Sequence, residues 1–103
     1  MRVKVSRSSR GHRAHIEPHP GTYVVAGGAT AEEALHGAAR LLDTALSNPV
    51  VAAALPPGTV AAVRLLRSAT AAIRRGNLDD FLTHLAPAAV QSITRTLRRV
   101  LPW

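Results

Sequence analysis

The sequence contains no cysteine, one lysine and only three aromatic residues among its 103 positions. Without cysteine, disulfides, thiolate metal sites and cysteine nucleophiles are excluded. With a single Phe, Tyr and Trp, the core must be built from aliphatic side chains and alanine. Hydrophobic residues still make up 47% of the chain, which is enough for a modest core in one small domain.

Long apolar runs are also absent. The most apolar stretch, residues 49–66, is interrupted by the Pro-Pro-Gly sequence at 56–58 and by Arg64, so it cannot supply the ~20 apolar residues of a membrane span. The basic start of the chain is followed by polar residues at 6–20, where a secretory signal would need an apolar run. The sequence therefore predicts neither signal peptide nor membrane span, and a location in the cytoplasm or within a particle.

Positive charge dominates, with 13 Lys and Arg against 6 Asp and Glu and a net charge of +7. The excess lies at the two ends of the chain, in the first 20 residues and after residue 63. Nearly all the cations are arginine, whose planar guanidinium suits phosphate or carboxylate. An Ala- and Arg-rich composition is also typical of a GC-rich genome, so arginine usage alone identifies no ligand.

The N-terminal segment has the pattern of short strands. Residues 2–6 alternate polar and apolar, residues 14–17 are a second short candidate, and residues 22–26 are the best one, closed by Gly27 and Gly28. Two interpretations stay open for residues 1–20: a small β-hairpin, or a flexible basic arm.

After residue 30 the apolar spacing changes to that of amphipathic helices. Short links with Pro or Gly separate the segments, which predicts a mainly α (α+β) fold: a compact bundle of four to five short helices preceded by the basic arm or small β-hairpin. The expected organisation is 1–20 as basic arm or short strands and 21–103 as a single small domain, with a strand at 22–26 and helices at about 31–47, 50–55, 60–75, 78–86 and 88–101.

Local signals indicate where helices begin. Thr30 and Glu33 have the spacing of a capping box, in which each side chain accepts from a backbone N–H. Asn77 and Asp80 repeat this spacing with Asp in place of Glu, and Thr59 is expected to cap the third helix. On the first helix, the inward face is predicted to hold Leu35, Ala38, Leu42, Ala45 and Leu46, and the residues predicted to lie away from it are Glu32, His36, Arg40 and Asp43.

Three sets of basic residues are candidates for binding phosphates or an acidic partner. Arginine rows on a helix are typical of nucleic-acid-binding surfaces. Arginines near a helix C-terminus are also favoured by the helix dipole, so a purely structural role stays open. The candidates are Arg2, Lys4, Arg7, Arg10 and Arg13 in the N-terminal segment, Arg64, Arg67, Arg74 and Arg75 in the third helix, and Arg95, Arg98 and Arg99 in the last helix.

Other candidate sites are weaker. The basic segment has no aromatic residue for stacking bases, and Tyr23 is the nearest, so no stacking platform is expected. His15, Glu17 and His19 would point to one side of an extended chain, but neighbouring arginines disfavour a bound cation and no metal site is expected. Trp103 is a candidate interface anchor, with folding back onto the core as the alternative.

Catalytic patterns are missing from the sequence. It has no nucleophile elbow and no phosphate-binding glycine loop. Asp79 and Asp80 are adjacent and would diverge by about 100° on a helix, so they do not form a catalytic pair. The sequence therefore predicts a non-enzymatic protein that uses no cofactor.

Part of the chain resembles a known family. Residues 16–18 (Ile-Glu-Pro), 21–25 (Gly-Thr-Tyr-Val-Val) and 30–35 (Thr-Ala-Glu-Glu-Ala-Leu) resemble the strand, strand and helix opening of HicB-type antitoxins. The link between Val25 and Thr30 is shorter than the family's, and no helix-turn-helix or ribbon-helix-helix motif follows. The chain is therefore not assigned to the family, and an antitoxin-like regulator is only a third interpretation.

Two functions are the main hypotheses. The first is a small non-catalytic assembly or adaptor protein that joins a larger complex, such as a phage or other multi-subunit particle, through its basic arm and apolar helix faces. Its partners would be protein subunits, including further copies of itself. The alternative is a sequence-tolerant nucleic-acid-binding protein that contacts DNA or RNA phosphates with the basic arm and the Arg-rich helix faces.

Overall fold

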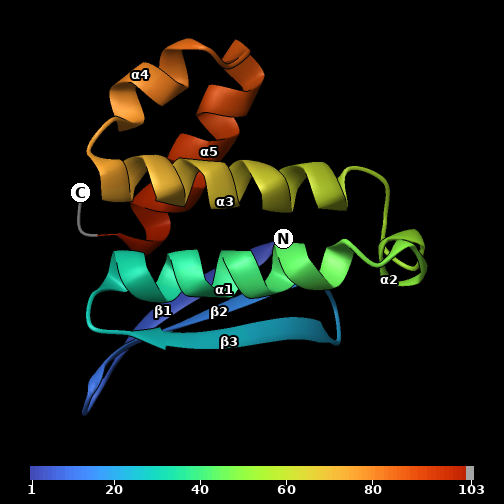
Figure 1. Ribbon diagram of the computed structural model, residues 1–103, viewed down its shortest axis with the longest axis horizontal. Helices are drawn as coiled ribbons and strands as arrows, with labels where there is room; N and C mark the ends of the chain where they lie inside the picture. Colours follow the sequence, from blue (N-terminus) through green and yellow to red (C-terminus); the bar gives the residue numbers. More distant parts are fainter. Residues whose placement is uncertain (102–103) are drawn as a thin grey trace.

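The computed structural model describes residues 1–101, which form a three-stranded sheet followed by five helices (Figure 1). The strands pair antiparallel in the order β1-β2-β3. The α+β fold class predicted from the sequence is confirmed. The elements are β1 (Arg2–Ser8), β2 (Gly11–His19), β3 (Thr22–Gly28), α1 (Ala31–Leu46), α2 (Pro49–Ala53), α3 (Thr59–Arg75), α4 (Leu78–Thr83) and α5 (Pro87–Val100).

The basic N-terminal segment is a β-hairpin. β1 pairs with β2 along its whole length, from Arg2 opposite Glu17 to Ser8 opposite Gly11. Val3 and Val5 of β1 pack against the core. The interpretation of residues 1–20 as a flexible arm is wrong, because the hairpin ladder uses the backbone of β1 and the core holds its alternate side chains.

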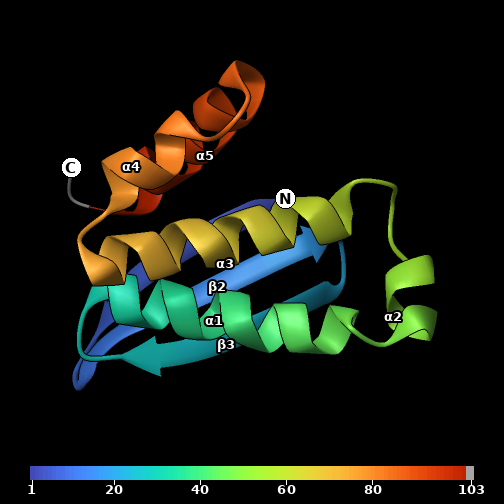
Figure 2. The ribbon, with the colours of Figure 1, turned by 45° about the horizontal axis from the view of Figure 1, so that its top comes forward.

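One face of the sheet is covered by α1, which runs alongside β3 and also contacts β2 (Figures 1 and 2). Ala14 and Ile16 of β2 are fully buried on this face, and Val24 and Ala26 of β3 lie opposite them in register. α3 runs antiparallel beside α1, and α5 packs against β1 and α3. The other face of the sheet carries no helix among residues 1–101, and its alternate side chains are exposed on β1 and β3 and exposed or half-buried on β2.

The core is aliphatic and rich in alanine, as predicted. Its largest fully buried side chains include Ile16, Leu35 and Leu66, while alanines along α1 and α3 let the two helices approach closely. Leu78, Phe81, Leu82 and Leu85 extend the core, partly buried, toward the α4–α5 hairpin. Among residues 1–101, every helix is too short or too polar to traverse a lipid bilayer.

The face assignment of α1 needs three corrections. His36 and Asp43 are buried, although the sequence predicted that they lie away from the core, and Ala45 is exposed although it was predicted to face inward. His36 and Asp43 are buried because α1 has two neighbours, the sheet and α3, so its buried surface is wider than a single apolar stripe. The other predicted inward residues of α1 are buried.

Helix capping follows the local signals in part. The Glu33 N–H donates to Thr30 Oγ1 at 3.1 Å, and the Glu33 carboxylate accepts from the Ala29 N–H at 3.0 Å, one residue before the position of a standard capping box. α3 begins after Gly58, which has a φ of 85°, so the prediction that Thr59 caps it is wrong.

The predicted capping box at Asn77 and Asp80 is also wrong. α3 ends on Gly76 in the left-handed conformation, and the Asn77 N–H donates to the Ala72 carbonyl at 3.0 Å. This Schellman closure holds Asn77 away from the extended backbone that a capping residue adopts, and its side chain makes no capping hydrogen bond. Trp103 lies outside the described residues, so its predicted role as an interface anchor stays a prediction.

Candidate functional site

The first arginines of α3 turn toward a buried carboxylate on α1. Arg67 Nη1 donates to Asp43 Oδ2, and Arg64 Nε lies 3.6 Å from Asp43 Oδ1. The Asp43 side chain is only 12% exposed, so its charge needs this compensation. Two of the predicted phosphate-binding residues therefore have an internal partner that joins α1 to α3.

His36 forms a second polar contact between α1 and α3, and we call the contact surface of these two helices the α1–α3 seam. Its Nδ1 lies 2.7 Å from Thr70 Oγ1. The Thr70 hydroxyl donates to the carbonyls of Leu66 and Arg67, so it accepts from His36 and the proton sits on Nδ1. Burial lowers the pKa of His36, and the charges of Arg74, Arg40, Arg67 and Arg75 lower it further, which keeps the imidazole neutral at pH 7.

Sequence reasoning missed this seam, although a signal was present. His36, Ala39, Asp43 and Leu46 are spaced i, i+3, i+7 and i+10, which is a second helical stripe beside the one that faces the sheet. Two polar residues in that stripe obscured it.

Arg74 and Arg75 lie exposed at the C-terminal end of α3, where the helix dipole stabilises them.

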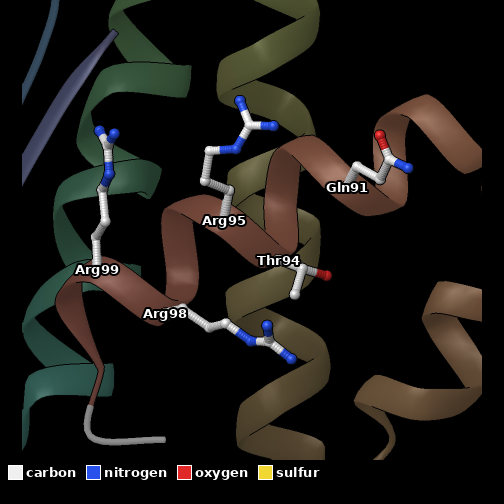
Figure 3. A pocket seen from close by; sticks show the side chains of 5 residues that line it. All are labelled: Gln91, Thr94, Arg95, Arg98 and Arg99. Carbon is white, nitrogen blue, oxygen red and sulfur yellow. The ribbon is translucent and has the colours of Figure 1, made fainter.

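Within the described residues, the arginines of the last helix have no carboxylate partner. Figure 3 shows Arg95 and Arg99 projecting to one side of α5 and Arg98 to the other, beside Thr94. All three arginines are exposed, and with Gln91 and Thr94 they line a shallow hollow with a volume of about 480 Å³. Among residues 1–101, the only arginines within 4.0 Å of a carboxylate are Arg64 and Arg67. We name Arg95, Arg98 and Arg99 the α5 arginine row.

The N-terminal cations are divided by the β-hairpin. Strand alternation and register place Arg2, Lys4 and Arg13 on the uncovered side of the sheet. Arg7 and Arg10 lie exposed near the tip of the β1–β2 hairpin, away from this group. The structure therefore brings together three of the five predicted N-terminal residues.

Tyr23 of β3 lies on the same uncovered side, next to His15 of β2. The two ring centroids are 4.9 Å apart with the planes inclined at 43°. Tyr23 is 59% exposed, and Val25 follows it on the same side of β3. The signal in the sequence is the alternation within residues 22–26, but only the pairing of β3 with β2 brings Tyr23 to the basic strands. We name this surface the open sheet face; it comprises Arg2, Lys4, Arg13, His15, Glu17, Tyr23 and Val25.

The histidines of β2 do not converge. His12 lies on the covered side, where its Nδ1 is 3.3 Å from the Ala29 carbonyl, whereas His15 lies on the open sheet face. Within the described part of the chain, no three His, Asp or Glu side chains are placed to share a metal ion.

An apolar groove separates α3 from α4. Its volume is about 670 Å³, and Val60, Leu65, Phe81 and Leu85 line it together with Arg64. These apolar residues are only partly buried, so the groove is open to solvent.

No protein-family model matches the chain, and neither a curated protein nor a solved structure matches it.

Proposed function

We propose that this protein is a non-catalytic nucleic-acid-binding protein that contacts phosphates with little dependence on sequence. The α5 arginine row carries the proposal: three exposed guanidinium groups on one helix have no carboxylate within 4.0 Å among residues 1–101. Arginine binds phosphate oxygens through two parallel N–H donors, and release of condensed counterions favours such contacts. The cations of the open sheet face add further positive charge to that of the α5 arginine row.

The acidic residues strengthen this proposal by their positions. Asp43 is compensated by arginines inside the α1–α3 seam, and the Glu33 carboxylate caps α1. Asp79 and Asp80 occupy the first turn of α4, where the helix dipole favours them. The carboxylates of Asp43 and Glu33 are therefore engaged within the fold and do not offset the exposed arginines. A nucleic-acid partner is consistent with a location in the cytoplasm or within a particle.

The test is binding to random-sequence duplex DNA across a salt series. The logarithm of the binding constant should fall linearly with the logarithm of salt concentration, and Arg98→Gln should reduce the slope by about 0.9 if it removes one phosphate contact. Arg64→Gln is the matched control, because it removes the same charge from an arginine that faces Asp43, and it should change the slope less than Arg98→Gln does. A binding constant that does not change with salt concentration, or no binding at low salt, would refute the proposal.

A second candidate is the assembly or adaptor function, and the α3–α4 groove favours it. The basic arm is a strand of the sheet, and this groove offers an apolar concave surface on the helices. Its occupant would be an amphipathic helix of an acidic partner subunit, with apolar residues against Leu65 and Phe81 and a carboxylate near Arg64.

A peptide titration tests this second candidate. Amide chemical shifts would be followed while a Leu- and Glu-rich helical peptide is added to the protein. Changes centred on Val60, Leu65 and Phe81, abolished by Leu65→Glu, would support groove binding. Chemical-shift changes spread evenly over the basic surfaces would mean that the peptide binds by charge alone, which would reject this candidate.

A further inference from the structure

We infer that the open sheet face binds single-stranded nucleic acid, with Tyr23 stacking on a base while Arg2, Lys4 and Arg13 contact the phosphates. The inference rests on the proposed function and names its substrate class. It depends on a combination that the strand pairing creates: an exposed aromatic ring and three cations on one uncovered side of a sheet.

The ring is supported from the central strand. His15 lies opposite Lys4 on β1 and opposite Val25 on β3, so one row of side chains crosses all three strands. Tyr23 leans on the His15 ring with a centroid distance of 4.9 Å, which restricts the phenol before any ligand arrives. Because 59% of Tyr23 remains exposed, part of its ring is available to a base.

The cations lie where a backbone crossing the ring would run. Arg2 and Lys4 project from β1 on the same side, and residues two apart on a strand are separated by about 6.5–7 Å. Arg13 projects from β2 beyond His15. Glu17 faces Arg2 in register and offsets charge at that end of the sheet. The phosphates are therefore expected to lie nearer Lys4 and Arg13 than Arg2.

The geometry favours a single strand over the alternatives. Bases inside a duplex stack on each other, so they have no free face for Tyr23, whereas unpaired bases stack readily on aromatic side chains. A second copy of this chain packed sheet to sheet would oppose like charges at Lys4 and Arg13. Exposed Val25, at 42%, adds apolar surface beside the ring that a base can cover.

The experiment compares a thymidine oligonucleotide with a duplex of equal length. Tyr23→Leu should weaken single-strand binding by roughly 5- to 150-fold, the loss of one base stack, and should leave duplex affinity unchanged. Tyr23→Phe keeps the ring and should bind like the unsubstituted protein. Leu41→Ala is a matched control, because Leu41 is an exposed apolar residue on α1, away from this face, and should have no effect.

A second measurement uses the unsubstituted protein and does not depend on how any variant folds. Oligonucleotide-induced chemical-shift changes should centre on Tyr23, His15 and Lys4. If Tyr23→Leu binds the single strand normally, or if the changes avoid this face, the inference is overturned while salt-dependent duplex binding can still uphold the proposed function. If neither nucleic acid binds at low salt, both are overturned.

Discussion

The contact between Thr70 and His36 joins the two central helices, and Thr70→Val removes it with almost no change of shape. Thr70 is 1% exposed, and its hydroxyl accepts from His36 Nδ1 at 2.7 Å. The carbonyls of Leu66 and Arg67, to which the hydroxyl also donates, lie within α3 and keep their helical partners. The substitution therefore leaves one group without a partner, the Nδ1–H of His36.

The expected loss follows from burial. His36 is 9% exposed, so water replaces the lost acceptor poorly, and a buried unsatisfied donor costs about 1–3 kcal/mol. Each kcal/mol lowers the Tm by about 4–8 °C in a domain of roughly this size. The double variant His36→Leu/Thr70→Val replaces both polar partners with apolar groups. It should be no less stable than Thr70→Val alone, with a coupling energy of about 0.5–3 kcal/mol.

Urea unfolding followed by far-UV circular dichroism measures these differences. Thr44→Val is the control, since Thr44 is an exposed residue of α1 and the same substitution there should change the free energy of unfolding by less than about 0.5 kcal/mol. Equal losses at Thr70 and Thr44, or strict additivity in the double variant, would show that the His36–Thr70 contact does not stabilise the fold.

Three further predictions concern stability. Burial and then neighbouring arginines lower the pKa of His36 below its ordinary 6.5, so the unfolded chain binds the proton at a higher pH than the folded protein does. The free energy of unfolding should therefore fall as the pH drops below 6.5. His36→Asn should flatten this pH dependence, and an unchanged profile would contradict the prediction. Gly28→Ala would place a Cβ 2.6 Å from the backbone of α1 and should cost about 1–3 kcal/mol in urea unfolding, whereas Gly27→Ala, with 3.7 Å to its nearest atom, should be tolerated; equal effects would refute the steric argument. Asp43→Ala should lower the free energy of unfolding by about 1–3 kcal/mol, and a loss under about 0.5 kcal/mol would mean that its arginine contacts add nothing.

The sequence by itself determined the features that depend on near neighbours along the chain. Alternation identified the strand at 22–26 and left residues 1–20 open between a hairpin and an arm, and the apolar period identified the helices to within three residues at their ends. Thr30 caps the start of α1 as its sequence predicted, and equally local features mark the start of α2, at Asn48 with Pro49, and the end of α3, at Gly76. These signals work because capping hydrogen bonds and backbone preferences involve residues at most a few positions apart.

Only the tertiary structure decided which surfaces are covered and which side chains meet. His36 and Asp43 became interior residues because α3, more than 20 positions later, packs on a second side of α1. Tyr23 joined Lys4 and Arg13 because β2 pairs with a strand on each side, in registers that bring these residues to one face. Such meetings depend on how distant elements pack and on strand register, where a shift of one residue turns every side chain to the opposite face.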